Sequence, residues 1–142
     1  MGDRVPLVPL TYTVVETAWQ TQLGQGFKVR SPEHRFLLIT LSVTNGGNGD
    51  VSIPLLNLEG PDGQTHQELA NGEGVDNWFG LLRTVSPAET QQGRILFDVP
   101  LTSYKLRLPS GDLSSDRAAW VQIPLHMDTD NQVQAPIPGA GR

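Results

Sequence analysis

The stretch Ser86–Pro100, which reads SPAETQQGRILFDVP, constrains the fold more than any other part of the chain. A turn centred on Pro87 leads into a segment in which apolar residues recur at every second position, at Ile95, Phe97 and Val99. Alternation with this period is typical of a strand that buries one face against a core. The sequence therefore predicts an antiparallel sheet that is apolar on one side.

The same alternation recurs along the rest of the chain, with turn-forming residues between the segments. Strands are expected at residues 5–19, 35–44, 51–58, 64–69, 94–99, 104–108 and 119–125. Pro6 and Pro9 place the start of the first strand at a sheet edge, and Pro54 marks an edge or a bulge in the third. No segment of useful length shows a helical period. We expect an all-β fold, an immunoglobulin-like antiparallel β-sandwich of about seven to eight strands, with a barrel of similar strand count as the main rival.

The length of 142 residues suits a single domain that buries a core without disulfides. The sequence after Met127 is polar and then contains Pro136, Pro138, Gly139 and Gly141. We therefore assign the sandwich to residues 1–127 and a flexible C-terminal tail to residues 128–142.

Composition excludes several classes of function. The chain has no cysteine, so it holds neither disulfides nor thiolate metal sites. The net charge of −5 disfavours binding to nucleic acid, which requires clustered Lys and Arg. No apolar run approaches the roughly 20 residues of a membrane-spanning helix.

Basic side chains come close together in one segment only, at Lys28, Arg30, His34 and Arg35. This segment is either a solvated loop or a patch for an anion or a lipid headgroup. We keep Lys28, Arg30 and Arg35 as candidate partner-binding residues on the second interpretation.

The three histidines, His34, His66 and His126, have no ligand-spaced partner nearby in the sequence. Asp62 or Asp128 would join them only through the tertiary fold. An enzyme with such a dispersed metal site is therefore one hypothesis, but we expect no metal and no cofactor. The sequence Asp128–Gln132 resembles the start of a calcium loop but lacks the central Gly and closing Glu of that motif.

Catalytic motifs are missing as well. The chain has no Gly-x-Ser-x-Gly elbow and no pair of carboxylates at a spacing suited to acid–base work. Asp98 faces outward from its strand, where we expect it to be solvated or paired with Lys105 or Arg107. The sequence therefore predicts a protein that is not an enzyme.

Aromatic residues provide the remaining candidate site. Trp78 and Phe79 lie in the longest irregular stretch, where they either plug the open end of the sandwich or form an exposed hot spot for a partner. Trp19 and Trp120 lie in or beside alternating segments and are expected at core or sheet-edge positions.

Three motifs in this order resemble a known family: RFLLITLSVTN at 35–45, VSPAE at 85–89 and GRILFDVP at 93–100. Over about Gly2 to Leu108 the chain resembles the bacterial immunoglobulin-like domain of unknown function found in many predicted cell-envelope lipoproteins. A secreted mycobacterial immunoprotective antigen shares this sandwich. The motifs are structural, so the resemblance implies a fold and no catalytic residues.

The resemblance also implies a location and a role. Members of the family generally follow a signal sequence and a lipidated Cys, whereas this chain opens with Met1-Gly2-Asp3. We expect an extracytoplasmic protein anchored through a removed lipidated N-terminus; a cytosolic protein is the other interpretation. The expected function is a non-catalytic binding module of the bacterial cell envelope, with a protein or an envelope ligand as partner. The alternative is a structural component of a larger envelope complex, assembled through edge-strand or aromatic-loop contacts, and the oligomeric state stays open.

Overall fold

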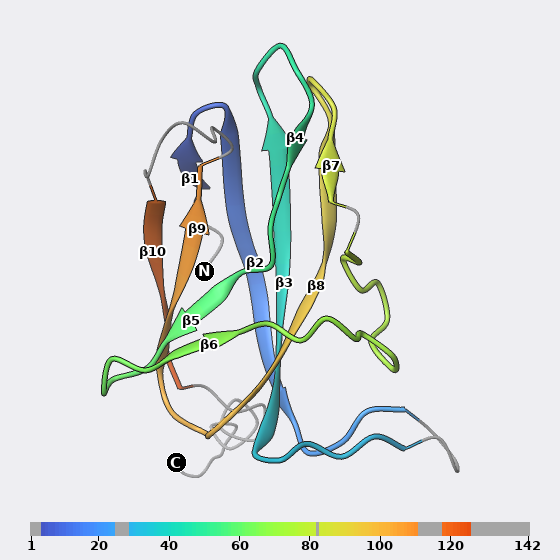
Figure 1. The fold of residues 1–142 in the computed structure, drawn as a ribbon, viewed down its shortest axis with the longest axis vertical. Helices are drawn as coiled ribbons and strands as arrows, with labels where there is room; N and C mark the ends of the chain where they lie inside the picture. The colour runs from blue at the N-terminus through green and yellow to red at the C-terminus, as the bar shows by residue number, and fades with distance from the viewer. Residues whose placement is uncertain (1–3, 25–28, 82, 111–117, 126–142) are drawn as a thin grey trace, which may run out of the picture.

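Alternating apolar and polar residues arrange the chain as two antiparallel sheets around one core (Figure 1). The computed structural model describes residues 4–24, 29–81, 83–110 and 118–125, and these contain ten strands and no helix. The strands are β1 (Arg4–Leu7), β2 (Leu10–Gln20), β3 (Arg35–Asn45), β4 (Val51–Ser52), β5 (Asn57–Glu59), β6 (Thr65–Gln67), β7 (Thr84–Val85), β8 (Thr90–Val99), β9 (Tyr104–Pro109) and β10 (Ala118–Ile123). The predicted all-β sandwich is confirmed. The expected tail at 128–142 lies outside the described residues.

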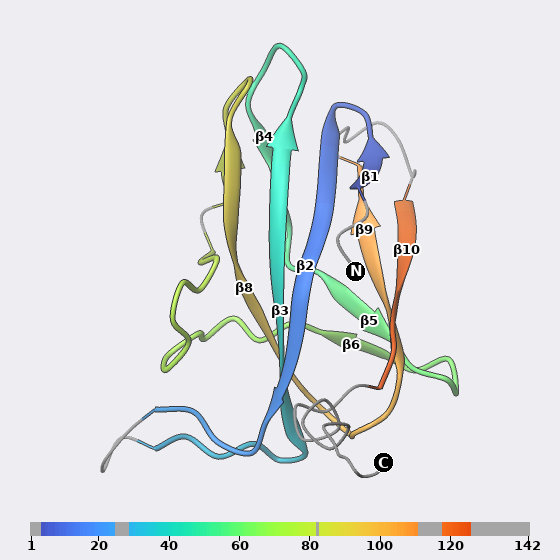
Figure 2. The same ribbon diagram turned by 180° about the vertical axis from the view of Figure 1, so that it is seen from behind.

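The two main sheets have four strands each, in the orders β1-β2-β3-β8 and β10-β9-β5-β6. All pairs are antiparallel. The second sheet is in front in Figure 1 and the first is in front in Figure 2. A third, short ladder pairs β4, which follows β3 in the chain, with β7, which precedes β8. Pro6 lies in the outermost strand of the first sheet, as its missing N–H predicts.

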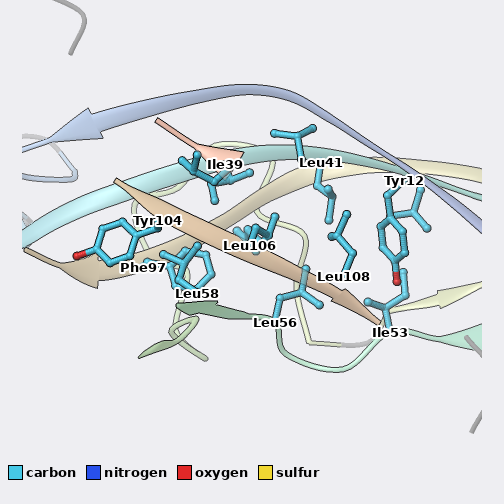
Figure 3. Packing of buried hydrophobic residues seen from close by; sticks show 14 of the residues in the cluster. Tyr12, Ile39, Leu41, Ile53, Leu56, Leu58, Phe97, Tyr104, Leu106 and Leu108 are labelled. Carbon is cyan, nitrogen blue, oxygen red and sulfur yellow. The ribbon is translucent and has the colours of Figure 1, made fainter. Parts of the chain in front are cut away.

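The core fills the space between the two sheets. Figure 3 shows Leu58, Leu106 and Leu108 of the second sheet facing Ile39 and Leu41 of the first. All five side chains are buried, and the alternation predicted for these strands is therefore confirmed.

Three differences from the sequence-based expectation explain why the strands are more numerous than expected. The segment expected at 5–19 is a hairpin of β1 and β2 that turns at Val8–Pro9. The segment expected at 51–58 is two strands, because the chain passes at Pro54 from the β4–β7 ladder to the second sheet. The third difference is β7, which the alternation did not indicate because only two residues pair.

A β-bulge shifts the phase of β2. Its register against β3 changes between Val14 and Glu16, which leaves Val15 as the extra, exposed residue. Tyr12 and Val14 face the core before the bulge, and Trp19 faces it afterwards. The bulge thus buries an odd-numbered residue on a strand whose earlier core residues are even-numbered.

The outer face of β3 and β8 carries a second, smaller apolar cluster. It consists of Leu23, Phe36, Leu38 and Leu96, with Leu69 packed against it. The alternation predicts a sheet that is apolar on one side, but here the second side is covered as well. Leu23, from the segment between β2 and β3, and Leu69, from the segment between β6 and β7, pack on this face.

The outer edge of β8 is covered by the segment 77–79. The Phe79 N–H donates to the Arg94 carbonyl at 2.8 Å, and the Arg94 N–H donates to the Asn77 carbonyl at 2.8 Å. Gly93 permits this approach, since a β-carbon there would lie 2.9 Å from the Phe79 Cα and 3.0 Å from the Asn77 oxygen. The segment therefore occupies an edge that would otherwise be open to another strand.

Asp98 is not paired with Lys105 or Arg107, which lie in the other sheet. Its carboxylate accepts the backbone N–H groups of Glu33 and His34 at 2.8 and 2.9 Å. The residue therefore anchors the loop that leads into β3, a contact that the strand alternation alone does not indicate.

A buried ion pair joins Arg83 to Glu68, and each residue is 3% exposed. The pairing is bidentate: the Arg83 Nη1 donates to Glu68 Oε2 at 3.0 Å and the Nη2 donates to Oε1. Two such bonds fix the orientation of both side chains. The pair is the only salt bridge among the described residues.

Further bonds from the pair hold the segment that crosses between the sheets. The Leu56 N–H donates to Glu68 Oε2 at 3.0 Å, and the Glu68 N–H donates to the Leu56 carbonyl at 2.9 Å. Arg83 donates through Nε to the Gly80 carbonyl at 2.6 Å, and its carbonyl accepts the Ile53 N–H at 3.0 Å. The ion pair thereby connects the strand that follows Pro54 with the segments after β6 and before β7.

Both tyrosine hydroxyls tie strands together at the ends of the sandwich. Tyr12 donates to the Pro109 carbonyl at 2.6 Å, which joins β2 to β9. Tyr104 donates to the Pro100 carbonyl at 2.5 Å, across the connection from β8 to β9. This second contact has the form of a tyrosine corner. Burial raises the pKa of the Tyr12 phenol well above its usual value.

We expect Arg83→Met to lower the free energy of unfolding by about 3–5 kcal/mol, because it leaves the Glu68 carboxylate buried without a counterion. The double variant Arg83→Met with Glu68→Leu should recover most of that loss, since no uncompensated charge remains. Urea unfolding followed by tryptophan fluorescence measures both. Arg4→Met, at an exposed position of β1, is the control. A single variant no less stable than this control would contradict the prediction.

We expect Gly93→Ala to cost about 1–3 kcal/mol, because its methyl group pushes the segment 77–79 away from β8. The control is Gly49→Ala, where an added β-carbon meets no atom within 4 Å. Urea unfolding compares the two variants, and hydrogen exchange at the Phe79 and Arg94 amides should accelerate only in the first. Equal stabilities would show that the segment does not pack as described.

We expect the stability of the protein to fall as the pH rises above about 10. The pKa of Tyr12 is higher in the folded state, so above that pH the unfolded state releases its phenolic proton first and is favoured. Tyr12→Phe should flatten this decline, because phenylalanine does not ionise. Urea unfolding at several alkaline pH values gives the two curves, and parallel curves would refute the assignment.

Candidate functional site

The outer face of the β10-β9-β5-β6 sheet presents its side chains to solvent. Leu58, Leu106 and Leu108 are buried, so the residues that alternate with them on β5 and β9 face outward. Residues paired across strands share a face, which extends the set to β6 and β10. We call this set the tryptophan face; it comprises Asn57, Glu59, Thr65, Gln67, Lys105, Arg107, Trp120 and Gln122.

The register places these residues in two rows that cross the strands. One row runs Trp120, Arg107, Asn57, Gln67. The other row runs Gln122, Lys105, Glu59, Thr65. Neighbouring strands lie about 4.8 Å apart, so successive residues of a row are evenly spaced.

The indole of Trp120 is the large apolar group of this face and is 49% exposed. Trp120 lies on an outermost strand of its sheet, which agrees with the sheet-edge position expected for it. Its use as a candidate site was missed. The alternation could have indicated it: Val121 and Ile123 face the core, so Trp120 lies on the opposite face of the strand.

The surface beside Trp120 is hollowed. A hollow of 300 Å³ is lined by Glu59, Lys105, Trp120 and Gln122. A second hollow of 330 Å³ shares Glu59, Lys105 and Gln122 and extends to the turn 60–63 and to Tyr104. The two form a trough that runs along the second row, from the indole to the β5–β6 turn.

The β5–β6 turn that ends the trough is held by backbone and side-chain bonds. The Gly60 N–H donates to the Gln64 carbonyl at 2.8 Å, and the Gln64 N–H donates to the Asp62 carboxylate at 3.1 Å. Gly63 has a φ of 85°, a conformation in which glycine is favoured. The trough therefore has a fixed wall.

On the far side of this turn lies a third hollow of 270 Å³, whose lining includes Asp62, His66, Pro100 and Tyr104. The His66 ring meets the Tyr104 ring edge to face at 5.8 Å. Burial and then the negative charge of Asp62 raise the pKa of the Tyr104 phenol. The Tyr104 hydroxyl donates to the Pro100 carbonyl, and the side chain forms one wall of this hollow.

The aromatic pair predicted from sequence lies elsewhere. Trp78 is half-buried, and its ring covers Gly72 so closely that a β-carbon at Gly72 would have no room. Phe79 is also half-buried; it packs against the main core and lies 5.4 Å from the Arg83 guanidinium carbon. Both residues are used in packing within the chain.

The predicted basic cluster is only partly described. Arg30 is half-buried; its Nη1 donates to the carbonyls of Asn71 and Glu73 at 2.8 and 3.0 Å, and its guanidinium lies over the Phe36 ring. Arg35 is half-buried at the start of β3, while Lys28 lies outside the described residues. The structure brings neither Arg30 nor Arg35 to the tryptophan face.

Two further observations concern the described residues alone. They contain no group of three or more His, Asp or Glu side chains that could hold a metal ion. They also contain no helix of the length and hydropathy needed to cross a membrane. His126 and Asp128, two residues of the dispersed metal site considered above, lie outside the described residues.

Solved structures with the same fold come from several bacteria. The yjhA protein of Bacillus subtilis is 15% identical with a TM-score of 0.67, over 87% of this chain and 97% of that one. The Bacillus subtilis protein ycdA, described as a candidate lipoprotein, is 11% identical with a TM-score of 0.69, over 89% of this chain. This chain spans only 39% of ycdA.

The fold is also similar to that of MPT63, described as a secreted protein of Mycobacterium tuberculosis. The two are 23% identical over 68% of this chain and 73% of that one, with a TM-score of 0.50. The likeness to a secreted mycobacterial sandwich that the sequence indicated is thus confirmed at the level of the fold. The sequence matches none of the curated proteins with which it was compared.

The three motifs at 35–45, 85–89 and 93–100 correspond to β3, the turn before β8, and β8 itself. β3 and β8 pair with each other in the first sheet, and residues 1–119 as a whole match one family. The chain belongs to the family described as the domain of unknown function DUF4352.

Proposed function

We propose that the chain is a non-catalytic binding module that works outside the cytoplasm, at the bacterial cell envelope, and that the tryptophan face holds its ligand. The observation that carries the proposal is the half-exposed Trp120 indole beside a trough lined by Glu59, Lys105 and Gln122. Exposed aromatic groups with polar neighbours are typical of binding sites, because the ring supplies contact area and the polar groups supply direction.

The descriptions of two structural neighbours support the proposed location. One structural neighbour is described as a candidate lipoprotein and another as a secreted protein. A rigid sheet face that is separate from the core suits a module attached to other parts of an envelope protein, since a ligand on that face leaves the sandwich undisturbed.

A structural role through edge strands or through Trp78 and Phe79 is the second proposal, and it has less support. The segment that contains both residues already occupies the β8 edge, and the Trp78 ring is turned onto Gly72. A partner at this position would have to displace contacts within the chain before it gained its own.

We expect Trp120→Ala to weaken binding to isolated bacterial cell envelopes by tenfold or more, because truncating a central aromatic residue commonly costs about 2 kcal/mol. Co-sedimentation of the purified protein with the envelopes measures the bound fraction. The free energy of unfolding, measured in urea, should change by less than about 0.5 kcal/mol, because the indole is half-exposed.

Leu81→Ala is the matched control, because Leu81 is another exposed apolar residue, 54% accessible, outside the tryptophan face. It should bind envelopes as the unaltered protein does. Unchanged binding by Trp120→Ala would show that the ligand does not use this face.

A further inference from the structure

The tryptophan face differs in charge from the molecule as a whole. Its charged side chains are Lys105, Arg107 and Glu59, a net +1, whereas the chain has a net charge of −5. Lys105 and Glu59 are direct cross-strand partners, which leaves Arg107 as the cation without an acidic neighbour in its row. The face is therefore complementary to a ligand that carries negative charge.

The uncharged residues of the face have a different chemistry. Gln122, Asn57 and Gln67 each offer both amide donors and a carbonyl acceptor, which is what a hydroxyl group requires. The Trp120 indole offers a flat apolar surface that fits the C–H face of a sugar ring. Together these groups match a molecule that alternates small apolar faces with many hydroxyls.

The arrangement of the first row sets a direction for such a ligand. Arg107 is the direct cross-strand neighbour of Trp120, and Asn57 and then Gln67 follow across the sheet. The step between strands, about 4.8 Å, is comparable with the length of one pyranose ring. A sugar chain lying across the strands would meet the indole, the guanidinium and the two amides in turn.

We infer that the tryptophan face binds an acidic polysaccharide whose sugar rings carry carboxylates. One ring stacks on Trp120, the neighbouring carboxylate pairs with the planar guanidinium of Arg107, and the hydroxyls bond to the amides. The inference rests on the proposed function, because it names the ligand class of the same face. The sugar chain follows the first row, and the trough lies beside the Trp120 end of that row.

An anionic membrane surface is the competing partner for an aromatic and basic face, and the structure favours it less. Membrane-bound surfaces combine their basic residues with several large apolar ones. The other large apolar side chains exposed on the described part of the chain lie outside the tryptophan face: Val8, Val15, Val29, Leu81 and Leu125.

Isothermal titration with tetragalacturonate tests the inference. We expect saturable binding that weakens with added salt, and binding of the uncharged α-1,4-linked galactotetraose at least tenfold weaker. Trp120→Ala and Arg107→Gln should each lower the affinity for tetragalacturonate by tenfold or more. Arg4→Gln, which removes an exposed arginine from β1, should leave it unchanged.

Three results would overturn the inference. They are equal affinity for the two sugars, equal affinity for a tetraglutamate peptide, and binding to phosphatidylglycerol vesicles in place of tetragalacturonate. If no sugar binds while Trp120→Ala still weakens binding to envelopes, the acidic polysaccharide is wrong and the proposed function stands. If Trp120→Ala weakens binding neither to the sugar nor to envelopes, the acidic polysaccharide and the proposed function are both wrong.

Discussion

The path of the chain between its two sheets depends on one carboxylate and one guanidinium that are removed from water together. Glu68 and Arg83 lie outside the strands, yet they bind each other and the backbone on both sides of the crossing at Pro54. A pair of this kind adds little net stability compared with apolar residues of similar size, because desolvation offsets the attraction. The pair instead restricts the paths that the chain can take between the sheets. A path that buried one of the two groups without the other would leave an uncompensated charge in the core, which is strongly destabilising.

This restriction explains how the second sheet keeps its register although two of its strands, β5 and β6, are short. β5 and β6 pair over only three residues each, and ladders of this length are weak by themselves. The reciprocal bonds between Leu56 and Glu68 continue the β5–β6 pairing beyond the ladder, and the ion pair fixes its end. At the other end of this sheet, the Tyr104 hydroxyl closes the connection from β8 to β9. The strands that carry the tryptophan face are thus positioned from both ends.

The sequence predicts the long strands well and the contacts between them poorly, for one physical reason. Apolar residues recur at every second position from Leu37 to Val43 in β3 and from Ile95 to Val99 in β8, so the burial of these residues follows from the period. Glu68 and Arg83 are fifteen residues apart in stretches with no period, and their pairing exists only after the sheets form. The bulge at Val15 likewise depends on the tertiary structure. So do the bonds that the Glu33 and His34 N–H groups donate to Asp98. The same period places Trp120 on the face opposite Val121 and Ile123, but the sequence left both a core and a sheet-edge position open for it.

The position of Trp120 shows how this sheet separates the residues that stabilise the core from those that form the outer surface. On β9 the core residues Leu106 and Leu108 alternate with Lys105 and Arg107, which face outward from the sheet. Substitution of the second set changes the charge and shape of the outer face at little cost to folding, because surface changes rarely exceed about 0.5 kcal/mol. The loop aromatics Trp78 and Phe79 lack that freedom, since they cover Gly72 and pack on the core. The sheet face can therefore be varied more freely than the loop, because its side chains are not needed for packing.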